Sequence, residues 1–136
     1  MKDLRVLVVE DSPEAMKLLT YFLSDLGIDH VHPANCGRDA LTFLDLCGEM
    51  IDVVLCDWKM PDMSGLDVLK QIRGACMDIP FLMVTGSAGI TDVSLAKSHG
   101  VTAYIKKPYS RDELAKKLSV VARLVRANNP NRAPGY

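Results

Sequence analysis

The stretch Ile51-Asp52-Val53-Val54-Leu55-Cys56-Asp57 shows the pattern that decides the fold, a short and mostly apolar run that ends in an acid. Such a run is typical of a strand that is buried on both faces. Similar runs occupy residues 4–9, 28–33, 80–85 and 101–105. Longer segments with apolar residues at helical spacing separate these runs, so the sequence predicts strands and helices in alternation.

The first helical segment carries clear end signals. Ser12 suits the N-cap, Pro13 suits the first helical position, and Gly27 suits the exit. Six apolar residues are expected on its inward face: Ala15, Leu18, Leu19, Phe22, Leu23 and Leu26. Further helices are predicted over residues 38–46, 64–73, 91–98 and 111–126, and a flexible, hinge-like loop over residues 86–89.

Five strand–helix units predict an α/β fold, in which a doubly wound parallel sheet is flanked by helices on both faces. We expect one domain over residues 1–127. Residues 128–136 contain two prolines and no periodicity, and are expected to form a flexible tail. Ligands of open sheets of this kind lie at the carboxyl ends of the strands, so the strand exits are the place to look for chemistry.

Composition narrows the function classes. The 136 residues are 49% hydrophobic and include 16 Lys and Arg against 17 Asp and Glu, which excludes disorder along the whole chain. A formal net charge of −1 argues against electrostatic capture of nucleic acid or of an anionic membrane. The four cysteines form no CxxC pair, which disfavours a zinc or redox site. Without a signal peptide pattern or a spanning segment, we expect a cytoplasmic protein.

Polar residues stand at four of the predicted strand exits. Glu10 and Asp11 follow the first strand, Asp57 ends the third, Thr85 ends the fourth, and Lys106-Lys107-Pro108 follows the fifth. We expect these side chains to converge on one edge of the sheet. Three carboxylates in one place repel each other unless a cation lies among them, and oxygen-only ligands favour Mg²⁺.

A lysine and a hydroxyl beside such a metal site would complete a shell that binds a phosphoryl group. The carboxylate of Asp57, at the end of the central strand, can then act as a nucleophile toward phosphorus and form an aspartyl-phosphate. Metal and lysine would together offset the charge that develops on the transferred group.

These pieces together resemble the receiver domain of two-component response regulators, over about residues 4–126. The matching pieces are Val8-Val9-Glu10-Asp11, residues 57–66 (DWKMPDMSGL), Met83-Val84-Thr85 and Tyr104-Ile105-Lys106-Lys107-Pro108. Each piece alone is a weak signal. The four pieces in order, each at a predicted strand exit, form a specific one.

The resemblance implies a flavodoxin-like receiver fold with five parallel strands in the order 2-1-3-4-5 and five helices. It implies that Asp57 is the phosphoacceptor and that Glu10 and Asp11 form the acidic pair that holds Mg²⁺, with Asp11 as the direct ligand. The backbone carbonyl of Lys59 matches the remaining protein ligand of the metal.

Five positions match residues to which the family gives further roles. Thr85 matches the hydroxyl that bonds a phosphoryl oxygen, and Lys107 matches the lysine that pairs with the phosphate and precedes a cis peptide bond. Tyr104 matches the aromatic residue whose rotamer reports activation, although a core aromatic without that role stays open. Lys59 and Ser87 occupy the positions that tune attack of water on the phosphate, and we expect Lys59 to alter the phosphate lifetime.

The implied function is that of a stand-alone response regulator rather than an enzyme. A histidine kinase or phosphotransfer protein would donate the phosphoryl group. A downstream effector protein would bind the face formed by the fourth helix, fifth strand and fifth helix. The stretches around Asp57 and Thr85 are most similar to chemotaxis-type single-domain regulators, which bind a flagellar motor component, while phosphorelay shuttles share the same core.

Three other functions share part of this pattern of residues. Aspartate-nucleophile phosphatases carry a second Asp two residues after the nucleophile, where this chain has Lys59. A flavodoxin-like cofactor binder needs amides and hydroxyls to cradle phosphate in the first loop, where this chain has Glu10 and Asp11. A scaffold that works without phosphorylation stays open, although the intact set of site residues counts against it.

Overall fold

The computed structural model of the protein describes residues 2–86 and 89–128. Its five parallel strands form one sheet in the order β2-β1-β3-β4-β5. The strands are β1 (Arg5–Val9), β2 (His30–Ala34), β3 (Val53–Asp57), β4 (Phe81–Thr85) and β5 (Ala103–Lys106). The helices are α1 (Pro13–Asp25), α2 (Gly37–Cys47), α3 (Gly65–Gly74), α4 (Ile90–Ser98) and α5 (Arg111–Asn128), with a short 3₁₀ helix, η1 (Gly48–Met50). The predicted doubly wound fold is confirmed.

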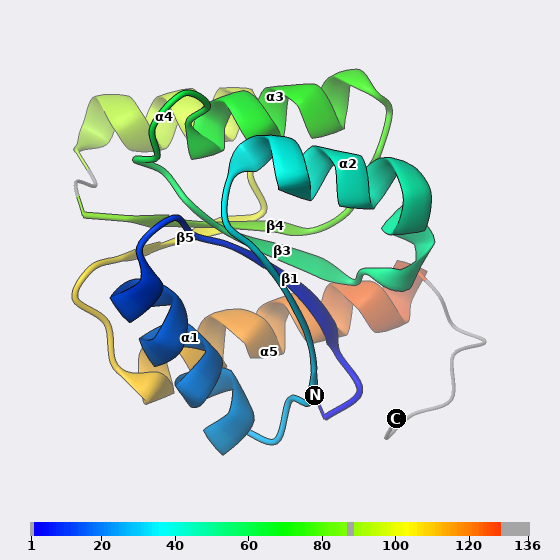
Figure 1. Ribbon diagram of the computed structural model, residues 1–136, viewed down its shortest axis with the longest axis vertical. Coiled ribbons are helices and arrows are strands. Elements are labelled where there is room, and N and C mark those ends of the chain that lie inside the picture. Colours follow the sequence, from blue (N-terminus) through cyan, green and yellow to red (C-terminus); the bar gives the residue numbers. More distant parts are fainter. Residues whose placement is uncertain (1, 87–88, 129–136) are drawn as a thin grey trace.

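The sheet separates two layers of helices. Helices α1 and α5 cover one face, and α2, α3 and α4 cover the other (Figure 1). Consecutive side chains of a strand point to opposite faces. Val6 and Val8 of β1 therefore enter the core between the sheet and helices α1 and α5. Leu7 and Val9 enter the core between the sheet and helices α2 and α3. The same strands therefore contribute side chains to both cores, which explains why these strands are apolar along their whole length.

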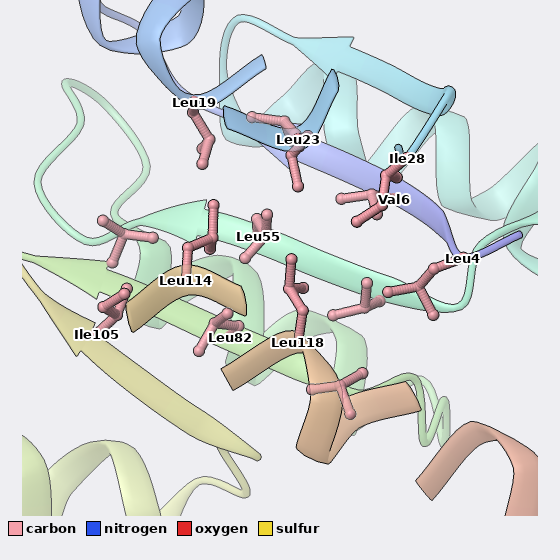
Figure 2. Packing of buried hydrophobic residues seen from close by; sticks show 14 residues of the cluster. Leu4, Val6, Leu19, Leu23, Ile28, Leu55, Leu82, Ile105, Leu114 and Leu118 are labelled. Carbon is pink, nitrogen blue, oxygen red and sulfur yellow. The ribbon is translucent and has the colours of Figure 1, made fainter. Parts of the chain in front are cut away.

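Figure 2 shows the first of these cores. Leu19 and Leu23 of α1 and Leu114 and Leu118 of α5 lie over Leu55 of the central strand. Leu114 and Leu118 are fully buried, and they are spaced by four residues, the spacing that places two side chains on one side of a helix. Helix α5 therefore packs on the sheet through the side that carries these two leucines.

The end signals of the first helix act as predicted. The Ser12 hydroxyl accepts a hydrogen bond from the backbone N–H of Ala15 at 3.3 Å, and Pro13 occupies the first turn. Gly27 follows the helix end with a φ of 83°, in the left-handed region that favours glycine.

One part of the predicted inward face is wrong. Leu19 and Leu23 are buried, but the side chain of Leu18 is 49% exposed. Neighbouring residues of a helix point about 100° apart, so a helix that buries Leu19 turns Leu18 toward its flank. The inward stripe of α1 is therefore narrower than the apolar pattern of its sequence.

Element ends differ from the expected ones by a few residues. The second strand begins at His30 rather than at residue 28, because Ile28 is buried in the core but precedes the paired segment. The last helix runs to Asn128, and η1 was not predicted. Ser87 and residues 129–136, where the sequence predicts part of a hinge and most of a tail, lie outside the described residues. Among the helices described, none is both long and apolar enough to cross a bilayer.

Candidate functional site

Strand register brings the polar strand exits to one edge of the sheet. Val9, the residue before Glu10, pairs with Cys56, and Asp57 pairs with Val84. Thr85 pairs with Lys106, and the backbone N–H of the next residue, Lys107, donates to the Thr85 carbonyl at 2.7 Å. Residues from four strand exits therefore share one site.

Lys107 joins the two buried carboxylates of this site. Its ammonium Nζ lies 2.9 Å from Oδ1 of Asp57 and 3.4 Å from Oε1 of Glu10. Glu10 and Asp57 are almost fully buried, whereas the Lys107 side chain is about one-third exposed. Lys106, its neighbour, is exposed. Of the two adjacent lysines, Lys107 is thus the one that contacts the carboxylates, and the peptide bond between it and Pro108 is cis, as the resemblance implies.

Charge and burial act against each other on these groups. Burial alone would lower the pKa of Lys107, but the hydrogen bond and charge of Asp57, together with the charge of Glu10, outweigh it and raise that pKa. Burial also raises the pKa of Glu10. The backbone N–H of Ser12, which donates to Glu10 Oε2 at 3.1 Å, opposes the rise, and the charge of Asp57 adds to it. The site therefore holds more negative charge than its ammonium group neutralises.

The acidic residues present fit a magnesium ion. Glu10, Asp11 and Asp57 each offer a carboxylate oxygen, and these oxygens lie within 4.8 Å of one another. The donor set is oxygen only, which suits a hard cation such as Mg²⁺, and the exposed side chain of Asp11 leaves an open side for the water that this ion keeps. A part for the Lys59 carbonyl stays a prediction.

Gly65 lets the first turn of α3 approach the end of β3. Its N–H donates to the Trp58 carbonyl at 2.8 Å, and a Cβ placed on it would lie 2.3 Å from the backbone oxygen of Asp57. Ser64 and Asp67 close a capping box around this turn, so the helix start is held in place by its own residues. The need for glycine at this position comes from the approach of β3, which is a tertiary feature.

A depression of about 550 Å³ opens on the α4 side of the site. Thr85, Lys59 and Asp92 are among the residues that line it. Thr85 is buried at the end of β4, and Lys59 is exposed, as expected for the loop after Asp57. The tuning role of Lys59 stays a prediction, and Ser87, the other residue assigned to tuning, lies outside the described residues.

Tyr104 is half-buried in β5, beside Met83 of β4. The ammonium of Lys117 in α5 lies 5.6 Å from the centre of its ring, within the range of a cation–π contact. Tyr104 therefore connects β5 to α5, and its part in a switch stays a prediction.

Sequence reasoning missed an apolar pocket that adjoins the carboxylates. The pocket has a volume of about 430 Å³ and extends from Glu10, Asp57 and Lys107 to Leu18 and Tyr109. Burial raises the pKa of Tyr109, and this phenol packs edge-on against Phe22 at a ring distance of 6.0 Å. The residue of the sequence that marks this pocket is Leu18, an apolar residue of α1 that lies outside the buried face of the helix.

The chain is similar to known proteins along most of its length. A family profile described as "Response regulator receiver domain" matches residues 6–119. The chain is 37% identical over 120 residues to the chemotaxis protein CheY1 of Helicobacter pylori, covering 87% of this chain and 96% of that protein. It is 36% identical to a chemotaxis protein CheY homolog of Campylobacter jejuni, covering 87% of this chain and 92% of that protein.

A solved structure shows the same architecture. The chemotaxis protein CheY4 of Vibrio cholerae superposes with a TM-score of 0.80 at 30% sequence identity, covering 88% of this chain and 98% of that one.

Proposed function

Since the chain belongs to the response regulator receiver domain family, we propose that it is a stand-alone response regulator that accepts a phosphoryl group on Asp57. The domain would span residues 1–127. The contact of Lys107 with Asp57 carries this proposal. Lys107 supplies a cation to Asp57, the carboxylate that ends the central strand at the edge of the sheet where the polar strand exits meet.

The chain's own residues have distinct parts in the transfer. An oxygen of Asp57 attacks the phosphorus of the donor, and the donor's leaving group departs with the electrons of the broken bond. Lys107 would offset negative charge on the transferred group, and the Thr85 hydroxyl would donate a hydrogen bond to one of its oxygens. Glu10, Asp11, Asp57 and the Lys59 carbonyl would hold Mg²⁺, which supplies electrostatic stabilisation of the phosphoryl oxygens when bound.

Phosphorylation would work as a switch through added charge. A phosphoryl group carries roughly −1.5 to −2 charge near neutral pH, in contact with Lys107 and Thr85. Thr85 and Tyr104 would respond by changing position. The face of α4, β5 and α5 would then bind an effector protein differently, by a shift between two populations.

Partners and compartment follow from the same proposal. The donor would be a histidine kinase or phosphotransfer protein, and the compartment the cytoplasm. Relatives described as chemotaxis proteins support a role in chemotaxis. Nucleic acid and membranes are not among the proposed partners, because a net charge near zero gives no broad electrostatic attraction to either.

Intact-mass measurement after incubation with Mg²⁺ and acetyl phosphate tests the central step. We expect the wild-type protein to gain one phosphoryl group and Asp57→Asn to gain none. Asp62→Asn is the matched control, because Asp62 is an exposed acid in the loop after Asp57 and its φ of 68° is one that asparagine tolerates. An adduct that persists in Asp57→Asn would overturn the assignment.

Lys59 has a separate test. In Lys59→Ala the rate of loss of phosphate from the isolated phosphoprotein is expected to differ from that of the wild type, because Lys59 and Thr85 line the same depression. An unchanged rate would contradict a tuning role for Lys59 and leave Asp57 as the acceptor.

A further inference from the structure

A second depression lies at the opposite end of the sheet from the phosphoacceptor site. It has a volume of about 520 Å³ and lies between the end of α2, helix η1 and the loop from α3 to β4. In Figure 1 these segments lie at the right-hand side, away from the carboxyl end of β3 and the loop that follows it. Its lining includes Leu46, which is 80% exposed, and Met50, which is 59% exposed, beside the half-buried Met77 and Ile79.

The rim of this depression is acidic. Asp45, Glu49 and Asp78 are exposed, and its described lining contains no lysine or arginine. The guanidinium of Arg73 lies close by: its Nη1 donates to the carbonyls of Met77 and Ile79, both at 2.8 Å, and its charge acts on Asp78.

The end of α2 adds to this negative field. The carboxyl end of a helix carries partial negative charge and is stabilised by basic side chains in its last turn. The last turn of α2 has no basic residue and instead contains Asp45. An acid at this position is unfavourable for the isolated helix, and a positively charged group that binds from outside would be stabilised here.

We propose that this surface, the acidic depression, binds an amphipathic helix of a partner protein whose apolar side chains are flanked by lysine or arginine. An apolar centre with a charged rim is the usual composition of a protein interface. Methionine and cysteine in the lining (Met50, Met77 and Cys47) are flexible or polarizable side chains that adapt to a partner. The volume is large enough for a few apolar side chains of the partner to enter. The carboxylates on the rim favour a partner whose apolar side chains are flanked by basic residues.

This partner is distinct from the effector proposed above. The acidic depression and the face of α4, β5 and α5 share no residues, so one partner can bind while the other site is occupied. A second copy of the chain offers related chemistry, because Val120 and Leu124 of α5 are exposed beside Arg123. Such a head-to-tail contact would join many copies into rings or open chains, so we favour a separate protein.

A designed peptide tests the proposal on the whole protein. The probe is a three-turn helical peptide with leucine on one side and lysine on the other. Its binding is measured from ¹H–¹⁵N correlation spectra of the labelled protein. We expect the peptide to shift the backbone amides of residues 45–50 and 77–79. A control peptide with glutamate in place of lysine should leave these amides unchanged, and higher ionic strength should weaken the lysine peptide.

Variants separate this surface from other acidic sites. We expect the combined change Asp45→Asn, Glu49→Gln and Asp78→Asn to weaken peptide binding by about tenfold. Leu46→Ser should also weaken it, whereas Val120→Ser, at an exposed apolar residue of α5, should not. These changes lie on the surface, and acetyl phosphate should still phosphorylate each variant, so a failure here is distinct from a failure of the phosphoacceptor proposal.

Three outcomes would overturn the proposal. The first is a set of amide shifts confined to Glu10, Asp11 and Asp57, which would place the peptide at the other acidic site. The second is equal binding of the lysine and glutamate peptides. The third is self-association of the protein that the charge variant abolishes, which would make a second copy the occupant.

Discussion

The ammonium of Lys107 lies 2.9 Å from Oδ1 of Asp57, although the two residues are far apart in the sequence and belong to the exits of different strands. Between them stands only one strand of the sheet, β4, so the contact depends on the order in which β3, β4 and β5 pair. Because Asp57 and Glu10 are buried, Lys107 stabilises the unphosphorylated site as well as the phosphoryl group that we propose the site receives.

Replacing this lysine should therefore change stability before any phosphorylation. We expect Lys107→Met to lower the free energy of unfolding at neutral pH by about 1–3 kcal/mol, because two buried carboxylates lose an ammonium partner. Added Mg²⁺ should restore more stability to this variant than it adds to the wild type, since cation binding to the folded state then relieves a larger repulsion. Urea unfolding followed by circular dichroism, with and without Mg²⁺, measures both effects. Lys106→Met is the control, and an equal loss in the two variants would contradict the prediction.

Two glycines of α3 should respond to alanine in opposite ways. In Gly65→Ala the new Cβ meets the backbone oxygen of Asp57 at 2.3 Å, so β3 and α3 must move apart. We expect a loss of roughly 1–3 kcal/mol in unfolding free energy and slower phosphorylation by acetyl phosphate. In Gly74→Ala the new Cβ meets nothing within 4 Å, and alanine stabilises a helix by up to about 1 kcal/mol relative to glycine. Two losses of similar size would show that close approach at Gly65 is not the cause.

The other end of the sheet holds an ion pair that the sequence did not reveal. The carboxylate of Asp52 accepts from Nε and Nη2 of Arg5 at 3.1 and 3.0 Å and from the Arg5 backbone N–H at 2.8 Å. Removing it in Asp52→Ala leaves these donors without their partner. We expect a loss of about 1–3 kcal/mol in urea unfolding and an unchanged phosphorylation rate. The exposed Asp29→Ala serves as the control. A stability equal to wild type in Asp52→Ala would mean that water replaces the carboxylate at no cost.

Cysteine reactivity reports the burial of the central strand. The thiol of Cys56 is fully buried, and burial, with the charges of Asp57 and Glu10, raises its pKa well above the ordinary value. Cys76 is exposed. Because the thiolate is the reactive form, we expect iodoacetamide to modify Cys76 in the native protein and to reach Cys56 only after unfolding. Peptide mapping by mass spectrometry distinguishes the two sites, and early labelling of Cys56 would contradict the buried position.

Much of the fold was predictable because its signals are local. Apolar runs such as residues 51–57 identify buried strands by composition alone, and Ser12, Pro13 and Gly27 mark helix ends through the backbone conformations that they favour. The alternation of strands and helices then predicts a parallel sheet, and a parallel sheet predicts that polar strand exits meet. The convergence of Glu10 and Asp57 follows from this chain of reasoning.

The remaining features depend on distances between segments that are not neighbours in the sequence. The helical pattern placed Leu18 inward, and only the orientation of α1 on the sheet exposes it. Arg5 meets Asp52 because β1 and β3 pair in one particular register, and Gly65 is required because α3 starts against the end of β3.

The sequence by itself determined which segments form strands and helices and which polar residues reach the strand exits, because periodicity and backbone preference are properties of neighbouring residues. Only the tertiary structure decided that Lys107 contacts both Glu10 and Asp57 and that Asp45, Glu49 and Asp78 surround an apolar depression. Contacts of this kind depend on strand register and on how each helix lies across the sheet, which many distant residues determine together.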